Sequence, residues 1–284
     1  MIKTILIVGG TGHYGQPVAK QLQKDGYTVR ILSRDIKRAR EKMGESFEYF
    51  QADVRNPETL IQASRGCFGL HINLSSSIHK HLQEIEYEGT LNCVRAAKSN
   101  DLSRITLISC AGVKRENLWS TPVKYKWRIE ELVRNSGIPY TIFAPTHFME
   151  GLPVYVKGDR ALIIGNQKQK IKWLSASDYA LLVSRAYASQ KAVNKKFLIF
   201  GPRAFTLEEA LKLYCKKKCP NVTILKTPLS TFMLMATISF NRKLMYVATL
   251  MKTISRINDS GDMSETSLIL GKPSISLEDW VVSL

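Results

Sequence analysis

The chain has 284 residues, which is enough for one large α/β domain with a smaller lobe and a sizeable core. Its composition, 44% hydrophobic and 23% charged, excludes a disordered, collagen-like or disulfide-stapled chain. The five cysteines show neither a CxxC pair nor a zinc-type spacing. The first strand is predicted to begin at the second residue, which leaves no room for a signal peptide. We therefore expect the cysteines to be reduced thiols in a cytoplasmic protein.

The charge is strongly basic, since 41 Lys and Arg stand against 24 Asp and Glu, and residues 151–200 hold the densest excess. Such a field favours anionic partners, here a phosphorylated cofactor, acidic lipid or an acidic protein. No Arg-rich stripe or RNA-binding signature accompanies it, so nucleic acid is not expected. A solvated basic surface explains the excess of positive charge more simply. Docking of the protein on an anionic partner is favoured only if residues 151–200 form one contiguous face. The apolar run 229–240 spans 12 residues, fewer than the ~20 of a membrane span, so only peripheral membrane contact stays open.

In the first 150 residues, short apolar runs alternate with segments of helical periodicity. The predicted strands are 2–8, 28–32, 47–51, 68–74, 104–109 and 139–144. The predicted helices are 16–25, 35–43, 57–65, 78–98 and 123–135. Runs as continuous as 2–8 are typical of strands buried on both faces of a parallel sheet. The alternation predicts a Rossmann-type, doubly wound α/β sheet over residues 1–150.

Beyond residue 150 the alternation loosens. We predict a helix over 177–187 with Ser177 as its cap, a helix over 207–217 and one or two apolar helices within 229–258. Shorter elements are predicted at 196–200, 222–225 and 277–281. Residues 151–284 are therefore expected to form a small α+β substrate or effector lobe, of which 177–210 packs back on the sheet. The group Phe232, Met233, Met235 and Phe240 is interpreted as core or as an adaptable apolar substrate roof.

The first predicted strand is followed at once by a glycine-rich loop and a helix. Its glycines satisfy both GxGxxG and GxxGxxG, a pattern that permits a tight turn and a close approach to a pyrophosphate. The N–H groups at the start of the helix would then bind the phosphates. This position between strand and helix predicts a dinucleotide site. The residues expected to contact the cofactor are Gly9, Thr11, Gly12, His13, Tyr14 and Gly15.

The ends of the second and third strands decide which dinucleotide is expected. Ser33 and Arg34 can hydrogen-bond a 2′-phosphate, whereas Asp35 either caps the next helix or binds an NAD ribose. NADP(H) is therefore favoured over NAD(H). Asp53 can accept from the adenine amino group or cap the following turn at residues 56 and 57, and both interpretations stay open. Val54 is also expected to contact the cofactor.

Seven segments carry a resemblance to a known family. They are VGGTGHYG (8–15), ILSRD (31–35), ADV (52–54), ISCAGV (108–113), KWRIEELVRNSGIPYTIFAPTHFME (126–150), SDYALLV (177–183) and FGPRAFTLEEA (200–210). With them the chain resembles the NmrA-like family of atypical short-chain dehydrogenases/reductases. The resemblance implies an NADP-binding Rossmann domain with a small C-terminal lobe. That family includes quinone and isoflavone-type reductases, and also NADP-sensing regulators with little or no catalysis.

The resemblance also implies a site, but with one departure. Typical short-chain dehydrogenases place a proton-donating Tyr four residues before a Lys; Lys126 matches the Lys, and Pro122 stands where the Tyr would be. Lys126 is then expected as general acid or ribose anchor, with Ser109 on the substrate side; a solvated lysine is the alternative. The residues expected beneath the cofactor are Asn73, Leu74 and Ser75, and those at its nicotinamide end are Pro145, His147 and Phe148.

These expectations converge on an NADP(H)-dependent reductase that transfers hydride to an apolar carbonyl or quinone. Two alternatives fit the missing Tyr: a non-catalytic NADP(H) sensor that acts through a protein partner, and an accessory subunit that holds NADPH and docks on a membrane complex. No metal is expected, because His71, His79 and His81 lack a carboxylate or Cys at ligand spacing.

Overall fold

A computed structural model describes residues 2–75 and 78–284. Its main sheet is formed by seven parallel strands. In sheet order they are β10 (Lys195–Ile199), β6 (Tyr140–Pro145), β5 (Arg104–Ile108), β4 (Gly69–Ile72), β1 (Thr4–Val8), β2 (Thr28–Ser33) and β3 (Glu48–Gln51). The order reverses direction between β1 and β4, and in such sheets ligands bind at the carboxyl ends of the strands beside this point. The α/β, Rossmann-type prediction is confirmed.

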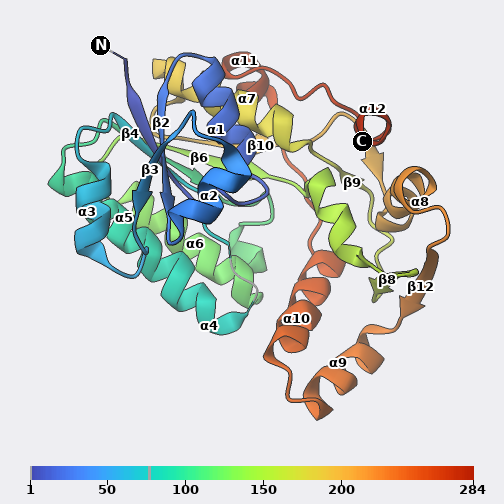
Figure 1. Ribbon diagram of the computed structural model, residues 1–284. Helices are drawn as coiled ribbons and strands as arrows, with labels where there is room; N and C mark the ends of the chain where they lie inside the picture. The colour runs from blue at the N-terminus through green and yellow to red at the C-terminus, as the bar shows by residue number, and fades with distance from the viewer. Residues whose placement is uncertain (1, 76–77) are drawn as a thin grey trace.

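Helices cover both faces of this sheet, as Figure 1 shows. Alternate residues of β1 go to opposite sides: Ile5 and Ile7 join one buried cluster, and Leu6 and Val8 join the other. The first cluster lies beneath α1 (Gly15–Lys24) and α7 (Ala176–Ala188). The second lies beneath α3 (Pro57–Ser64), α5 (Glu88–Ser99) and α6 (Thr121–Arg134). Between β2 and β3 runs α2 (Ile36–Met43).

The segments after β6 build a smaller unit with its own core. A three-stranded sheet joins β7 (Val156–Lys157), β8 (Arg160–Ile164) and β12 (Thr223–Thr227), and a two-stranded ladder joins β9 (Ile171–Lys172) to β11 (Ala204–Phe205). The turn η3 (Met149–Tyr155), α8 (Leu207–Lys218) and α12 (Leu277–Ser283) pack around Trp173 and Trp280. We propose the boundary of this unit at residue 150.

Two further helices form a hairpin that points away from both sheets (Figure 1). They are α9 (Leu229–Ile238) and α10 (Arg242–Arg256), which pack on each other and on Ile164 of β8. After α10 in the sequence comes α11 (Ser264–Ile269), which packs against the edge strand β10. Among the residues that the structure describes, no helix has both the length and the apolar character needed to cross a bilayer.

Several details correct the expectations. The helix predicted over 78–98 is a short turn α4 (His79–His81), a π-helical stretch η1 (Leu82–Tyr87) and α5. The cap of α7 is Ser175, whose hydroxyl accepts from the Asp178 N–H at 3.0 Å, and not Ser177. Phe232 is buried, but Met233, Met235 and Phe240 are exposed, so the core interpretation was wrong for these three. The short strands β7, β8, β9 and β11 were missed because two- to five-residue strands carry little periodicity.

Candidate functional site

The glycine loop is shaped by the absence of side chains. Gly9 has a φ of +86°, and a Cβ atom there would lie 2.1 Å from the Asn73 carbonyl oxygen. A Cβ on Gly15 would lie 2.2 Å from the Gly9 carbonyl oxygen, so α1 begins in direct contact with the loop. A Cβ on Gly12 would lie 3.2 Å from the Gly9 carbonyl oxygen and within 4 Å of no further atom of the described residues, so the space beyond it is open.

The start of α1 fits a phosphate group. No side chain caps the helix, since Tyr14 at the cap position makes no capping hydrogen bond, and its first turn holds no acidic residue. The N-terminus of such a helix carries a partial positive charge and unpaired N–H groups. Together with the open space at Gly12, this end of the helix suits the pyrophosphate of a dinucleotide. His13 is exposed beside it.

One cation follows β2, and a second reaches the glycine loop. Arg34 follows the strand and is exposed, and Lys42, from the last turn of α2, donates to the Thr11 carbonyl at 2.8 Å. Asp35 is the cap of α2, because its carboxylate accepts from the Arg38 N–H at 3.0 Å. The Ser33 hydroxyl donates to the Asp35 carbonyl. Of the two roles considered for Asp35, the structure shows the cap.

After the third strand, the Asp53 carboxylate is hydrogen-bonded by Arg55, two residues along the chain. Its two carboxylate oxygens accept from Arg55, through the backbone N–H at 2.9 Å and through the guanidinium at 2.6 Å. This hydrogen-bonded guanidinium lowers the pKa of Asp53, and the charge of Arg34 lowers it further. The next helix is capped by Asn56 and not by Asp53. Val54 is buried against Gly89, so its side chain belongs to the core.

Lys126 reaches the end of β4 from α6. Its ammonium donates to the Leu74 carbonyl at 3.2 Å and pairs with the Glu86 carboxylate at 2.8 Å. Glu86 lies in η1 and only 3% of its side chain is exposed, against 20% for Lys126. Asn73 is buried beneath Gly9, and Ser75 is exposed. Lys126 is therefore held at the end of β4, and of the alternatives a freely solvated lysine is excluded.

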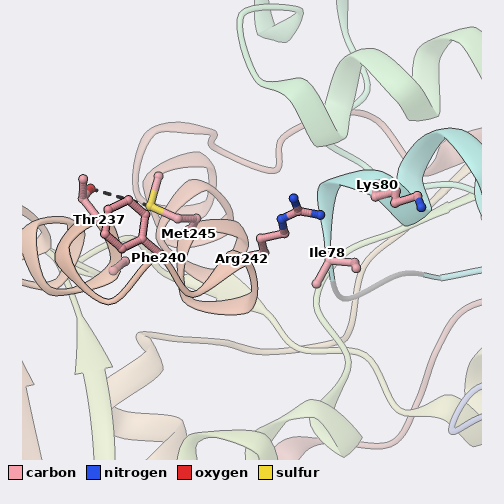
Figure 2. A pocket seen from close by; sticks show the side chains of 7 residues that line it. Ile78, Lys80, Thr237, Phe240, Arg242 and Met245 are labelled. Carbon is pink, nitrogen blue, oxygen red and sulfur yellow. Dashed lines mark hydrogen bonds between the residues drawn. The ribbon is translucent and has the colours of Figure 1, made fainter.

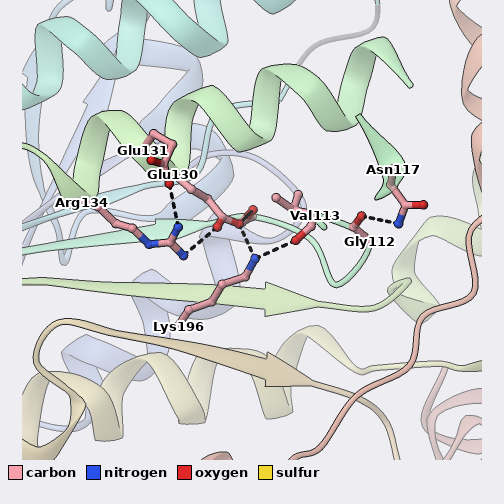
Figure 3. Close-up of polar contacts among 8 residues, drawn as sticks. Gly112, Val113, Asn117, Glu130, Glu131, Arg134 and Lys196 are labelled. Atoms are coloured by element: carbon pink, nitrogen blue, oxygen red, sulfur yellow. Dashed lines mark hydrogen bonds and ion pairs between the residues drawn. The ribbon is translucent and has the colours of Figure 1, made fainter. Parts of the chain in front are cut away.

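Ser109 belongs to a buried network that Figure 3 shows in part. Its hydroxyl donates to Glu130, whose carboxylate also pairs with Lys196 at 2.9 Å and with Arg134 at 3.0 Å. Lys196 in turn donates to the Val113 carbonyl. The network ties β5, α6 and β10 together. The Ser109 hydroxyl therefore faces Glu130 and makes no hydrogen bond to Lys126 within the described residues.

Cys110 follows Ser109 at the same edge of the sheet. Burial raises the pKa of its thiol to about 12, although the nearby charge of Lys126 acts in the opposite direction. The thiol is therefore protonated at neutral pH, and a thiolate nucleophile at this position is disfavoured.

The end of β6 contributes an aromatic wall. Phe148 is buried and stacks on Tyr14, with ring centroids 4.1 Å apart, so the loop after β6 packs directly on the start of α1. The His147 Nδ1 lies 3.4 Å from an Asp259 oxygen, which also accepts from the Thr146 hydroxyl. Pro145 is buried at the end of the strand. Asp259 comes from the loop after α10, far away in sequence.

Most of the predicted cofactor residues therefore lie along one edge of the sheet, at the carboxyl ends of β1 to β6. This edge combines the uncapped start of α1, two cations and the ion pair of Lys126 with buried Glu86. A model of the NAD(P)H-binding family matches residues 9–172, which is more than half of the chain.

The chain belongs to the NAD(P)H-binding family.

Membership of the NAD(P)H-binding family confirms the nicotinamide-dinucleotide prediction and the resemblance to atypical short-chain dehydrogenases. The Photosystem II assembly factor Ycf39 of Trieres chinensis is 24% identical over 234 residues, 80% of this chain and 72% of the relative. The NAD(P)H azoreductase of Xenophilus azovorans is 26% identical over 210 residues, 71% of this chain and 69% of the relative.

Solved structures of the same architecture match nearly the whole chain. The quinone oxidoreductase QOR2 of Escherichia coli, complexed with NADPH, gives a TM-score of 0.78 at 22% identity over 98% of this chain and 99% of the other. The triphenylmethane reductase of Citrobacter, complexed with NADP(H), gives 0.77 at 16% identity over the full length of both chains. At these identities the likeness shows the fold.

Sequence reasoning missed four residues of this region. Lys42, Glu86, Glu130 and Asp259 all act through contacts with residues at least 20 positions away. Lys42 lies in a basic run and Glu130 in the 126–150 segment that carries the family resemblance, but neither pattern indicates the contact that the residue makes. Within the basic block 151–200, Lys196 is turned inward to Glu130, and Arg185 donates to the Leu270 carbonyl.

Proposed function

We propose that the protein is an NADPH-dependent reductase that acts on an apolar carbonyl or quinone. When bound, NADPH supplies the hydride, and the protein supplies binding, orientation and a proton source. The observation that carries the proposal is Lys126, a cation held by the Leu74 carbonyl and by buried Glu86 at the strand end where ligands of this fold bind.

The preference for NADPH over NADH is supported by charge at the end of β2. Arg34 and Lys42 can pair with a 2′-phosphate, and Arg is suited to this by its planar set of donors. An NAD site needs a free carboxylate for the ribose hydroxyls, and here the Asp35 carboxylate accepts from the start of α2 instead. We infer that the 2′-phosphate lies between Arg34 and Lys42.

Lys126 is proposed to stabilise the oxygen of the substrate as it gains electrons, and to deliver the proton. A positioned ammonium lowers the energy of a developing negative charge most effectively where water is largely excluded. The Glu86 carboxylate holds the Lys126 ammonium at the strand end, and its negative charge stabilises the protonated form of Lys126 before the proton is delivered. Ser109 is proposed to act indirectly, because its hydroxyl fixes Glu130 beneath the same edge.

The test is a turnover assay. Purified protein, NADPH and a panel of quinones are followed by absorbance at 340 nm, for the wild type and for Lys126→Ala. General acid catalysis contributes about 10²–10⁴-fold, so kcat should fall by at least ~100-fold while NADPH still binds. Lys124→Ala, an exposed lysine of the same helix, is the matched control and should keep wild-type rates. Full turnover of Lys126→Ala would refute the assigned role.

A second candidate function is a non-catalytic one, in which bound NADPH has a structural or sensing role. It is favoured by the Ycf39 relatives, which are named as assembly factors, and by Pro122 in the place of the usual Tyr. Tight NADPH binding with no turnover across the panel would favour it over the reductase.

A further inference from the structure

The hairpin formed by α9 and α10 carries an unusual helix. α9 has the sequence LSTFMLMATI, without a charged residue, and it is apolar around most of its circumference. Helices of this kind are normally buried in a core or in lipid. Here only Phe232 and Ala236 are buried, and the rest of α9 is open to solvent or partly so.

The exposed apolar side chains of the molecule are concentrated on this hairpin. Of the thirteen large hydrophobic side chains that are exposed among the described residues, six lie between residues 233 and 245. They are Met233, Leu234, Met235, Ile238, Phe240 and Met245. A cluster of this kind is a mark of an interaction surface, unlike single exposed leucines elsewhere.

Phe240 at the tip of the hairpin is unfavourable twice over. It is 90% exposed, and its φ of +49° lies in the left-handed region, where a glycine or asparagine costs less than a bulky residue. Neither solvation nor backbone geometry explains a phenylalanine at this point. Such outliers are found where function requires the side chain.

The segment around the tip is basic, and of its cations Lys212 and Lys226 pair with Glu208. Residues 210–258 contain nine Lys or Arg and no Asp or Glu. Arg242 and Lys243 follow Phe240 almost directly, both are exposed, and neither has an ion-pair partner within the described residues. An apolar projection flanked by lysine and arginine only is the chemistry of a segment that lies in the interface of an anionic membrane.

A groove beside the tip is also suited to an anionic lipid. It has a volume of about 530 Å³ and is lined by apolar Ile78, Ala236, Phe240 and Met245 together with two cations, Lys80 and Arg242. Figure 2 shows Ile78 and Lys80 on one side and Phe240 and Met245 on the other, with Arg242 between them. Apolar walls with cations at the rim suit an acyl chain whose headgroup carries a negative charge. A second copy of this chain has 41 Lys and Arg against 24 Asp and Glu, so its net charge would repel Arg242 and Lys243.

We propose that the tip of the α9–α10 hairpin docks on a bilayer surface that contains anionic phospholipid. Phe240, Ile238 and Leu234 enter the boundary between headgroups and acyl chains, and Arg242 and Lys243 pair with headgroup phosphates. The protein thereby lies on the membrane and does not span it, since the apolar part of the hairpin is one short helix and its tip. The docking is independent of the proposed reductase activity.

The test is vesicle flotation with the full-length protein. Vesicles of phosphatidylcholine with about one-third phosphatidylglycerol should carry the protein upward, and vesicles of phosphatidylcholine alone should carry much less. Phe240→Gly should weaken the binding by at least about tenfold, since a large aromatic side chain no longer leaves water. Its melting temperature should stay equal or rise, because glycine accepts the left-handed backbone, and so loss of folding is separated from loss of docking. Arg242→Ala and Lys243→Ala should each weaken binding roughly fivefold.

The controls match the two kinds of change. Leu268→Ala removes an equally exposed apolar side chain from α11, and Lys98→Ala removes an exposed lysine from α5; both should bind as the wild type does. Binding that ignores phosphatidylglycerol, or that survives Phe240→Gly, would overturn the proposal. So would a wild type that fails to float but sediments as a dimer that Phe240→Gly dissociates, because the tip would then join two copies of the chain.

Discussion

The choice between NADPH and NADH rests on Arg34 and Lys42, and replacing them gives a quantitative test. Arg34→Ala removes the guanidinium after β2, and Lys42→Ala removes the ammonium beside the Thr11 carbonyl. Hydrogen bonds to a charged group contribute about 1.5–3 kcal/mol. Both side chains are exposed, so we take about 1.4 kcal/mol for each, which corresponds to about tenfold in Kd.

The assay is calorimetric titration of each variant with NADPH and with NADH. NADPH affinity should fall about tenfold in each single variant and roughly a hundredfold in the double variant if the effects add. NADH affinity should change by less than about threefold, because no phosphate contact is lost. Lys20→Ala, an exposed lysine of α1, controls for overall charge. Equal losses for both cofactors in the Arg34 variant would refute the 2′-phosphate site.

Three other predictions concern stability and the loop. Gly9→Ala should lower the free energy of unfolding, measured by urea titration, by about 1–3 kcal/mol, because its Cβ would overlap the Asn73 carbonyl. Gly26→Ala is the control: its φ is also positive, at +89°, but the space around it is open, so the cost should be only about 1 kcal/mol. Asp35→Ala should cost about 1 kcal/mol through the lost cap of α2 and leave NADH affinity unchanged; a large loss of NADH binding would show that the carboxylate binds a ribose. Burial lowers the pKa of His71 to about 3, so below pH 6.5 only the unfolded chain takes up its proton; stability should fall by about 2 kcal/mol between pH 7.5 and 5, and His71→Gln should remove most of that dependence.

The sheet and the loop were predictable because their signals are local. Continuous apolar runs such as 2–8 follow from burial on both faces, and Gly12 and Gly15 are required by contacts with the backbone of Gly9 and Gly10 in the same loop, whereas the contact of Gly9 is with the distant Asn73 carbonyl. The Arg34 position follows equally from the end of a strand. These elements depend on their own sequence more than on distant partners.

The remaining site residues required the folded chain. Ser109 carries no sign that it faces Glu130, which lies on another element, and Lys126 carries no sign that it pairs with Glu86. The hairpin tip was misjudged for a related reason. An apolar sequence normally predicts core, and only the structure shows that Phe240 is left in solvent.

The central claim is that a dinucleotide rests on the start of α1, and Gly12 offers the most direct test of it. A Cβ at Gly12 would lie 3.2 Å from the Gly9 carbonyl oxygen, which is a tight contact with backbone, so Gly12→Val should still fold, with a lowered melting temperature, while its side chain fills the space before the helix. Calorimetry should show NADPH binding to the wild type at micromolar concentrations, on the order of 8 kcal/mol, and none to Gly12→Val. A folded wild type that binds no nicotinamide cofactor at millimolar concentrations, or a Gly12→Val variant that binds as tightly as the wild type, would contradict the account.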